Sequence, residues 1–299
     1  MTGLVINLSK LTRMSKSDIN RIIDTAPRRY KVYTIRKRSG GRRIIAHPAR
    51  ELKTLQRALM QLSPPDLRVH TNATAYEAGS SILKNAEFHS DKTWLAKFDI
   101  RNFFNSITSA HWEEYLNSLN CSEEFMTTSS QVFFWQQRGP NSTCLSVGAP
   151  SSPFASNRFM YSFDEQISAY CVAREMEYTR YADDIAISSN DRIEFDELQH
   201  AIISFFPFAG VFHLNHEKTV LAGPGRRRSV TGLILNNEGN VSIGRKRKRI
   251  IEAMVHAYSL NRAMTEPEKI RGHLAFLKMI DPAGYERIRE RYRDRVDFF

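Results

Sequence analysis

Two adjacent carboxylates, Asp183 and Asp184, constrain what this chain can fold into more than any other feature of its sequence. Residues 175–180 mix apolar and polar side chains, while residues 185–189 (Ile-Ala-Ile-Ser-Ser) are β-branched or small, as is typical of a strand. The pattern predicts two short strands joined by a tight turn that carries both carboxylates. Adjacent carboxylates repel each other and lose hydration on burial, so a fold tolerates them best beside a cation. On its own, such a pair is more often a solvated turn.

A third carboxylate is available at the end of another predicted strand. Residues 93–100 (Thr-Trp-Leu-Ala-Lys-Phe-Asp-Ile) read as a strand that carries Asp99 near its end. If Asp99 lies beside the turn, the three carboxylates would bridge two Mg²⁺ ions about 3.5–4 Å apart. That geometry serves in-line phosphoryl transfer, with an activated hydroxyl and a neutralised pyrophosphate leaving group. Alone, Asp99 would more often be a structural cap, so its value lies in the combination.

Six short motifs lie between residues 85 and 232. They are Asn85-Ala86-Glu87-Phe88-His89, Phe98-Asp99 with Phe103-Phe104, Val147-Gly148-Ala149-Pro150-Ser151-Ser152-Pro153, Tyr181-Ala182-Asp183-Asp184, Leu214-Asn215-His216-Glu217-Lys218-Thr219 and Val230-Thr231-Gly232. Together they resemble the motifs of the reverse transcriptases, and the first and last resemble those of the bacterial retron type. Each motif is weak by itself, whereas six in the expected order are strong.

The resemblance implies an α+β fold, a right-hand polymerase with fingers, palm and thumb subdomains and no RNase H domain. The implied ranges are 1–30 for an N-terminal helical extension, 31–95 for the fingers, 96–244 for the palm with a helical insertion on the fingers side at about 110–145, and 245–299 for an RNA-binding thumb. It further implies RNA-directed DNA synthesis on a cognate structured non-coding RNA. That RNA would supply template and primer, deoxynucleoside triphosphates and two Mg²⁺ ions would be used, and the product would be a branched RNA–DNA hybrid (msDNA). Such enzymes commonly act in antiphage defence with a separate effector protein.

The resemblance also implies roles for individual residues at the carboxylates. Asp99, Asp183 and Asp184 would be catalytic and metal-binding, and Ile100 would add its backbone carbonyl, an oxygen that hard cations accept. Lys218 is a candidate general acid that protonates the departing pyrophosphate. A phosphate-neutralising or purely structural role for this lysine is equally open.

Nucleotide selection would fall to residues in the next two motifs. Phe104 would stack against the sugar and leave no room for a 2′-hydroxyl, whereas Phe103 is expected in the core. Gly148 and Ala149 would contact the nucleotide through their backbones. Val147 departs from the family pattern, which often has Gln there, and it offers no side-chain hydrogen bond.

Positive charge is concentrated at the two ends of the chain. Residues 1–50 hold 13 Lys or Arg and 2 Asp or Glu, residues 245–299 hold 14 and 8, and the whole chain has a net charge of +11. Basic ends around an acidic centre fit surfaces that hold phosphate backbones beside a metal-binding palm. Basic residues also cover ordinary protein surfaces, so neither end is decisive alone.

Several basic residues near the N-terminus lie on a predicted hairpin. By resemblance Arg43 is the best candidate to neutralise the triphosphate of the incoming nucleotide, with Arg36 and Lys37 behind it. The alternative for each is a solvated hairpin side chain.

Two other sets of residues are candidates for RNA binding. One is a run of five consecutive cations, which repel one another unless a polyanion is near: Arg245, Lys246, Arg247, Lys248 and Arg249. The other is Asn85 and His89, whose i, i+4 spacing would put both on one helix face. They are either a structural pair or, as the resemblance implies, readers of the structured RNA.

Periodicity and turn residues predict most of the remaining elements. Helices are expected at 11–25, 50–62, 245–260 and 267–280, a hairpin of strands at 30–35 and 43–46, and a second hairpin with a strand at 230–235, a turn at 236–240 and a return strand at 241–243. Ser15 or Ser17 is expected to cap the second half of the first helix.

Three cysteines, Cys121, Cys144 and Cys171, are too few and too widely spaced for a zinc site or a disulfide framework. They are expected to be reduced thiols of a cytoplasmic protein. No segment approaches the roughly 20 apolar residues of a membrane span, so no membrane association is expected.

Two rival interpretations of the chain stay open. One is another bacterial reverse transcriptase, intron-like or of another defence-associated type, although no long maturase or endonuclease extension is visible. The other is a non-catalytic RNA-binding scaffold with a degenerate palm. The intact Asp99, Asp183 and Asp184 argue against the scaffold.

Overall fold

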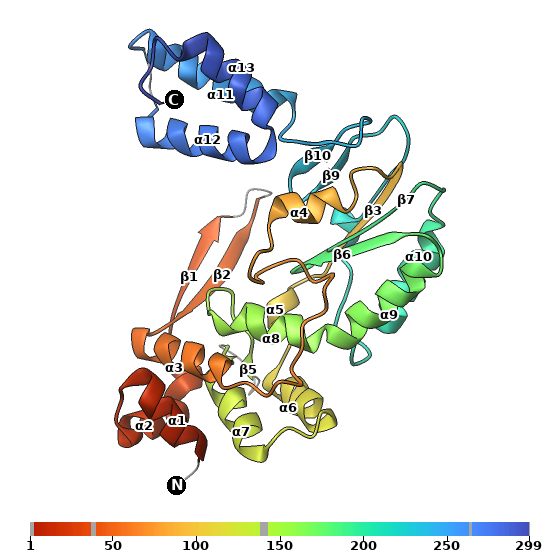
Figure 1. Cartoon of the computed structure of the whole chain (residues 1–299). Coiled ribbons are helices and arrows are strands. Elements are labelled where there is room, and N and C mark those ends of the chain that lie inside the picture. The colour runs from red at the N-terminus through yellow and green to blue at the C-terminus, as the bar shows by residue number, and fades with distance from the viewer. Residues whose placement is uncertain (1–2, 37–39, 138–142, 263–264, 299) are drawn as a thin grey trace.

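A computed structural model describes residues 3–36, 40–137, 143–262 and 265–298 of the chain (Figure 1). Helices near the N-terminus and a separate helical unit at the C-terminus lie at opposite ends of the molecule, with a twisted sheet between them (Figure 1). The architecture therefore mixes helices and sheets, as the sequence predicts.

The central sheet has four antiparallel strands in the order β6-β7-β3-β8. The strands are β3 (Trp94–Asp99), β6 (Glu177–Tyr181), β7 (Asp184–Ser189) and β8 (Val220–Ala222). Only Ala182 and Asp183 separate β6 from β7, and Ala182 adopts a left-handed φ of 59°. The predicted strand–turn–strand around the paired carboxylates is confirmed.

The two faces of this sheet differ because successive side chains of a strand point to opposite sides. On one face, Phe98 of β3 stacks on Phe195 of α10 (Phe195–Phe205), with ring centroids 5.3 Å apart, in the main hydrophobic core. The neighbouring residues of β3, Lys97 and Asp99, consequently lie on the opposite face. This alternation separates the apolar core from the acidic site.

The N-terminal segment forms two helices where the sequence pattern predicts one. Helix α1 (Gly3–Thr12) ends before Arg13, which has a left-handed φ of 59°, and α2 (Lys16–Thr25) starts after Ser15. The hydroxyl of Ser15 accepts a hydrogen bond from the amide of Asp18, so the predicted cap is confirmed. The single helix expected at 11–25 is wrong. The apolar residues keep a helical spacing across residues 13–15, and only the backbone conformation of Arg13 and the cap at Ser15 reveal that the helix is interrupted there.

The next elements agree with the sequence pattern. Strands β1 (Tyr30–Arg36) and β2 (Arg42–Pro48) form an antiparallel hairpin, and α3 (Arg50–Gln61) follows. Residues 37–39, including the predicted nucleotide-binding Lys37, lie outside the described residues.

A helical insertion follows β3, the strand that ends at Asp99. After the short α5 (Phe103–Ser106), helices α6 (Ser109–Ser118) and α7 (Glu123–Val132) pack on each other, and α7 also contacts α2 and α3. Two-residue strands β4 (Trp135–Gln136) and β5 (Thr143–Cys144) close the insertion. It then leads to α8 (Ser151–Phe159) and α9 (Tyr161–Val172), which carry the chain to β6.

A second, smaller sheet corrects one prediction. The segment expected as one strand at 230–235 is split into β9 (Arg228–Val230) and β10 (Leu233–Leu235), which pair with each other. Thr231 and Gly232 form the turn with φ of 47° and 83°, a conformation that continuous strands exclude. The predicted return strand is present as β11 (Val241–Ser242), and α4 (Ile82–Glu87) packs on all three strands.

The C-terminal unit consists of three helices, α11 (Arg245–Ser259), α12 (Pro267–Ile280) and α13 (Pro282–Tyr292). Both helices predicted here are confirmed. Buried Ile251, Leu274 and Ile288 join them to one another in a second hydrophobic cluster, which continues through β10 to Leu95 of the central sheet. In Figure 1 the hairpin of β1 and β2 lies on one side of the central sheet, and the three C-terminal helices lie above both.

Cys121, Cys144 and Cys171 are all free thiols, as expected. Among the helices of the described residues, none combines the length and the apolar character needed to span a membrane.

Candidate active site

The three predicted carboxylates meet where β3 ends beside the turn between β6 and β7. Asp99 lies directly opposite Asp184 in the antiparallel register, so both side chains leave the same face of the sheet. The turn itself is attached to the end of β3, because the amide of Ile100 donates to the carbonyl of Asp183 at 3.0 Å. The structure therefore brings together Asp99 and Asp184, which are 85 positions apart in the sequence.

Lys218 and Asn215 both bind the carboxylate of Asp99. The ammonium of Lys218 donates to Oδ2 at 2.6 Å, and the amide nitrogen of the Asn215 side chain donates to Oδ1 at 3.1 Å. The backbone amide of Asn215 also donates to the carbonyl of Asp99 at 2.8 Å, which fixes this loop on the strand. No comparable ion pair joins Asp183 or Asp184 to a cation within the described part of the chain.

The three carboxylates carry more negative charge than the nearby cation compensates. Desolvation, followed by the charge of Asp99, raises the pKa of Asp183. Desolvation, followed by the charges of Asp183 and Asp99, raises the pKa of Asp184 to about 6. Desolvation alone would lower the pKa of Lys218, but its hydrogen bond to Asp99 and the charge of that carboxylate raise it above the ordinary value. One lysine does not neutralise three carboxylates.

These donors have the chemistry that hard divalent cations prefer, since all are carboxylate oxygens. In the described conformation no set of three or more His, Cys, Asp or Glu side chains is gathered tightly enough to hold a metal ion. The raised pKa values of Asp183 and Asp184 nevertheless mark a site where added positive charge is favourable. The residues therefore fit a divalent cation, with the Lys218 ammonium as the present partner of Asp99.

A fully buried ion pair supports the turn at Ala182 and Asp183 from the core side. Arg180 donates to both carboxylate oxygens of Asp164 at 2.6 and 2.7 Å, and neither side chain has any solvent exposure. The same guanidinium donates to the carbonyl of Ala182 at 3.1 Å and to the side chain of Asn157 at 3.2 Å. Tyr178 adds a 2.6 Å hydrogen bond to Asp164. The left-handed turn is thereby clamped by a rigid network directly behind Asp183.

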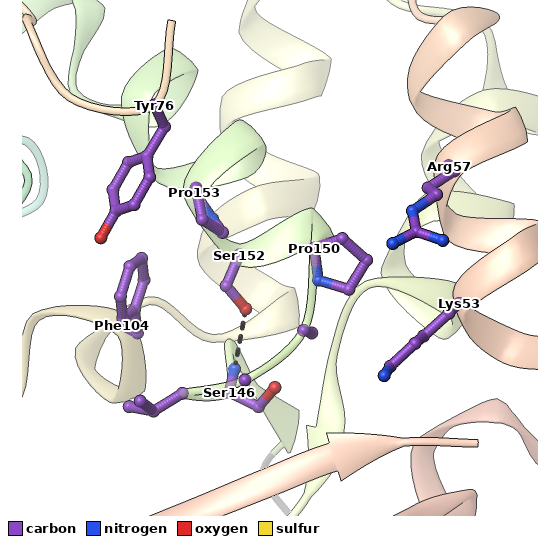
Figure 2. A pocket seen from close by; sticks show the side chains of 11 residues that line it. Lys53, Arg57, Tyr76, Phe104, Ser146, Pro150, Ser152 and Pro153 are labelled. Atoms are coloured by element: carbon purple, nitrogen blue, oxygen red, sulfur yellow. Dashed lines mark hydrogen bonds between the residues drawn. The ribbon is translucent and has the colours of Figure 1, made fainter. Parts of the chain in front are cut away.

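A pocket of about 360 Å³ lies near the carboxylates (Figure 2). Its lining residue Tyr76 shows this, because desolvation, followed by the charge of Asp183, raises the pKa of Tyr76. Phe104 lines the pocket, so its predicted stacking on the sugar stays a prediction, whereas Phe103 is buried in the core as predicted. Gly148 and Ala149 form part of the wall, and the predicted contact segment therefore faces the cavity. A Cβ at Gly148 would lie 3.2 Å from the carbonyl of Ala46 in β2, so this position needs glycine.

Tyr76 is a pocket residue that the sequence analysis missed. Figure 2 shows its ring above Phe104, and its centroid lies 6.4 Å from that of Tyr181 beside the carboxylates. Its φ of 67° is unusual for a bulky residue and its side chain is exposed. Strained backbones of this kind are concentrated at binding sites.

Cations approach the pocket from the hairpin and from α3. Arg43 is exposed on β2 and close enough to Asp183 to lower its pKa, against the larger effect of desolvation, which agrees with its predicted place near the site. Arg36 is exposed opposite Arg42, near the hairpin turn. Lys53 and Arg57 of α3 point into the pocket from the side opposite Phe104 (Figure 2), although the sequence analysis did not single them out.

The predicted RNA-binding pair Asn85 and His89 is buried. His89 bonds to Ser188 at 2.7 Å and Thr179 at 2.8 Å, and burial lowers the pKa of its imidazole to about 3. The side chain of Asn85 accepts a hydrogen bond from Thr74 at 2.7 Å. These contacts fit the structural alternative, because they attach α4 and its following turn to the central sheet.

The run of five cations opens α11, but its members differ. Lys248 forms an ion pair with Asp281, and the guanidinium of Arg247 stacks 4.2 Å from the ring of Phe276. The other three, Arg245, Lys246 and Arg249, are exposed and form no ion pair with a carboxylate of the described residues. The surface available to a polyanion is therefore smaller than the sequence alone suggests.

The comparisons with known proteins agree with this geometry. Residues 35–235 match the family described as "Reverse transcriptase (RNA-dependent DNA polymerase)". The Retron Ec83 reverse transcriptase of Escherichia coli is 37% identical over 272 residues, which cover 88% of this chain and 86% of that protein. The Retron Ec86 reverse transcriptase of the same organism is 30% identical over 284 residues, with coverage of 94% and 86%.

A solved telomerase from Candida albicans, in complex with a TWJ fragment of telomeric RNA, matches less well. The two chains are 12% identical with a TM-score of 0.49, and the match covers 89% of this chain and 56% of the telomerase. A likeness at this level bears on neither activity nor partners.

Proposed function

Since this chain belongs to the reverse transcriptases and, within them, to the retron type, we propose that it copies a cognate structured non-coding RNA into a branched RNA–DNA hybrid, msDNA. The chain is an RNA-directed DNA polymerase with the right-hand polymerase fold, and no RNase H domain is evident among its described residues. The single observation that carries the proposal is the meeting of Asp99, Asp183 and Asp184 beside a pocket lined by Phe104.

Reverse transcriptases use divalent metal ions, and we assign two Mg²⁺ ions to this site. Asp99, Asp183 and Asp184 would hold them, with the backbone carbonyl of Ile100 as a further oxygen ligand. When bound, the ions would supply charge for the attacking hydroxyl and for the pyrophosphate leaving group. The chain's contribution is to fix the carboxylates through the strand register and through the clamp on the turn by Arg180.

The pocket then positions the incoming deoxynucleotide. Phe104 would exclude a 2′-hydroxyl by occupying the space beside the sugar, while Gly148 and Ala149 present only backbone and a methyl group. Arg43, with Arg36 and Lys37 nearer the hairpin turn, would neutralise the triphosphate.

Lys218 would bind a phosphate oxygen or protonate the leaving pyrophosphate once Asp99 is engaged by metal. Its raised pKa keeps a proton on the ammonium at neutral pH, as a general acid requires. The hydrogen bond from this ammonium to Asp99 supports that role, because it holds the proton beside a proposed catalytic carboxylate.

RNA would be held by the exposed cations of α11 and by the basic N-terminal region. We also propose that the enzyme works in the cytoplasm, in an antiphage defence unit with a separate effector protein. Support for this part is the retron family membership alone.

Sequencing of the nucleic acid that co-purifies with the protein tests the proposal. The expected product is a DNA strand joined to an internal 2′-hydroxyl of a structured RNA. A DNA copy without that linkage would indicate another type of bacterial reverse transcriptase, and co-purified RNA without any DNA would favour the scaffold.

A further inference from the structure

A second cavity, of about 530 Å³, lies where α8 meets α9. It shares no lining residue with the pocket beside the carboxylates. Its walls come from the segment 67–77 on one side and from Arg158, Tyr161 and Glu165 on the other. None of the roles assigned above uses this cavity.

One wall is a stack of flat side chains. The guanidinium of Arg68 lies 5.2 Å from the ring centroid of Tyr161, and His70 meets the same ring edge-on at 6.1 Å. The side chain of Arg68 is exposed, and those of Tyr161 and His70 are half-buried. Unpaired nucleobases stack on aromatic rings and on guanidinium planes of this kind.

The back of the cavity holds an arginine with few partners. Arg158 stacks on Phe154 at 3.6 Å and donates to the carbonyl of that residue at 3.1 Å. Its Nε is buried without a hydrogen-bond partner, and its guanidinium lies in no ion pair with a carboxylate of the described residues. Desolvation lowers the pKa of Arg158, against the opposing effect of the nearby Glu77 charge. A hydrogen-bond acceptor at the unpaired Nε would therefore be stabilising.

The charges of the lining favour a neutral ligand with polar edges. Two arginines, Arg68 and Arg158, are balanced by Glu77 and Glu165. A phosphate would be repelled by the two carboxylates, whereas a base edge presents both donors and acceptors to such a set. The cavity is therefore better suited to a nucleobase than to a phosphate group.

The two cavities are adjacent along the same structural elements. Helix α8 contributes Pro153 to the first and Arg158 to the second, and the adjacent residues Tyr76 and Glu77 likewise line one cavity each. From Pro153 to Arg158 helix α8 advances five residues, a rise of about 7.5 Å. At about 3.4 Å per stacked nucleotide, this distance corresponds to about two nucleotides.

We propose that the second cavity binds an unpaired base of the RNA template about two nucleotides ahead of the base being copied. The inference rests on the proposed function, because it takes the first pocket as the place of the nascent base pair. The stack of Arg68, Tyr161 and His70 holds this base and keeps the template single-stranded as it enters.

The test measures binding of primer–template hybrids whose RNA template extends beyond the primer by one to eight nucleotides. Wild-type affinity should rise by about 5- to 100-fold once the extension reaches about three nucleotides, the copied base and two more, since stacking of one base on an aromatic side chain contributes that much. Tyr161→Ala should lose this gain while binding the shortest extension like wild type. Arg68→Gln, a change of an exposed side chain, should reduce the gain and guards against a folding defect in the first variant.

A matched control lies on the same helix. Tyr170 stacks with Arg174 at 3.7 Å, but it lines neither cavity, so Tyr170→Ala should keep the full gain. Equal gains in wild type, Tyr161→Ala and Arg68→Gln would overturn the proposal. Failure of the proposed function would look different, because wild type would then extend no primer at any template length.

Discussion

Arg180 and Asp164 form a fully buried ion pair whose arginine also donates a hydrogen bond to the carbonyl of Ala182, within the turn that carries Asp183. The pair lies on the core face of the sheet, while Asp183 and Asp184 are presented to the pocket side. The position of the carboxylates thus depends on the buried ion pair between Arg180 and Asp164, which is not accessible to a substrate.

The first prediction separates positioning from stability at this pair. Asp164→Asn should lower the free energy of unfolding by about 3–5 kcal/mol, because it leaves Arg180 buried without its counter-charge. The double variant Arg180→Met with Asp164→Leu should recover most of that stability, as apolar replacements of buried pairs often do. It should still synthesise DNA slowly, with a lower kcat and a similar KM for nucleotide, because the Ala182 carbonyl has lost its donor. Thermal melting and steady-state extension measure both quantities, and recovery of full kcat in the double variant would assign the pair a purely structural role.

The second prediction concerns the carboxylates. Asp183→Asn or Asp184→Asn should reduce DNA synthesis by more than about 100-fold, since each removes a charge from the metal site. RNA binding should change little, because the exposed cations lie elsewhere. Primer extension and RNA binding on the same preparations provide the measurement, with the exposed Asp191→Asn as control. Undiminished extension by either variant would contradict the assignment of the site.

The third prediction follows from the pKa of Asp184, which is raised to about 6. A carboxyl with a raised folded-state pKa binds its proton more tightly when folded, so its ionisation destabilises the metal-free protein and this loss is relieved as pH falls through 6. In EDTA, Asp184→Asn should therefore melt at a higher temperature than wild type at about pH 7.5, and the difference should shrink at about pH 5. Mg²⁺ should raise the melting temperature of wild type more than that of the variant. A variant that melts below wild type at both pH values would show that the charge is already compensated.

The fourth prediction tests Phe104 as the residue that excludes ribonucleotides. Phe104→Val should raise incorporation of ribonucleotides relative to deoxynucleotides by about 10- to 100-fold, by opening space beside the sugar. The neighbouring Phe103 is the control, because it is buried in the core and its replacement by Val should lower stability without changing the ratio. Competition between the two nucleotides gives the ratio directly. The same ratio in wild type and Phe104→Val would place the discrimination elsewhere.

The fifth prediction distinguishes, among the five cations at the start of α11, those expected to bind RNA from the one expected to stabilise the fold. Replacement of Arg245, Lys246 and Arg249 by Gln should weaken RNA binding and flatten its dependence on salt, because each phosphate contact releases counterions. Replacement of Lys248 by Gln should mainly lower thermal stability, since its partner Asp281 caps α13. Binding isotherms at several salt concentrations distinguish the two effects. If the triple variant keeps the wild-type salt dependence, RNA is held by other surfaces.

Local patterns were sufficient for much of the fold. The turn at Asp183 and Asp184, the strand ending at Asp99 and the helix at 267–280 all follow from the alternation or spacing of neighbouring residues. Such signals do not predict where a helix or strand is interrupted by a residue with a left-handed backbone, as at Arg13 and Thr231. A left-handed residue does not change the spacing of apolar residues around it.

The site was predictable to the extent that its chemistry lies in short motifs. The carboxylates, Phe104 and Lys218 belong to such motifs. In contrast, Asp164 is a single acidic residue on a helix, and only the tertiary fold reveals that it pairs with Arg180. Burial of His89 has the same origin, since its partners come from strands about 90 residues further along the chain.

The close contact between β2 and the segment at Gly148 has a mechanical consequence. The amide of Ala46 donates to the carbonyl of Val147 at 3.0 Å, and Gly148 leaves no space between the two backbones. The base of the hairpin is consequently fastened to the pocket floor, whereas its exposed outer part, Tyr33 and Ile35 with Arg43, has no such attachment among the described residues. A bend of the hairpin over a substrate would therefore begin beyond Ala46. The outer half of the hairpin would move, whereas the pocket residues next to Gly148 would keep their positions.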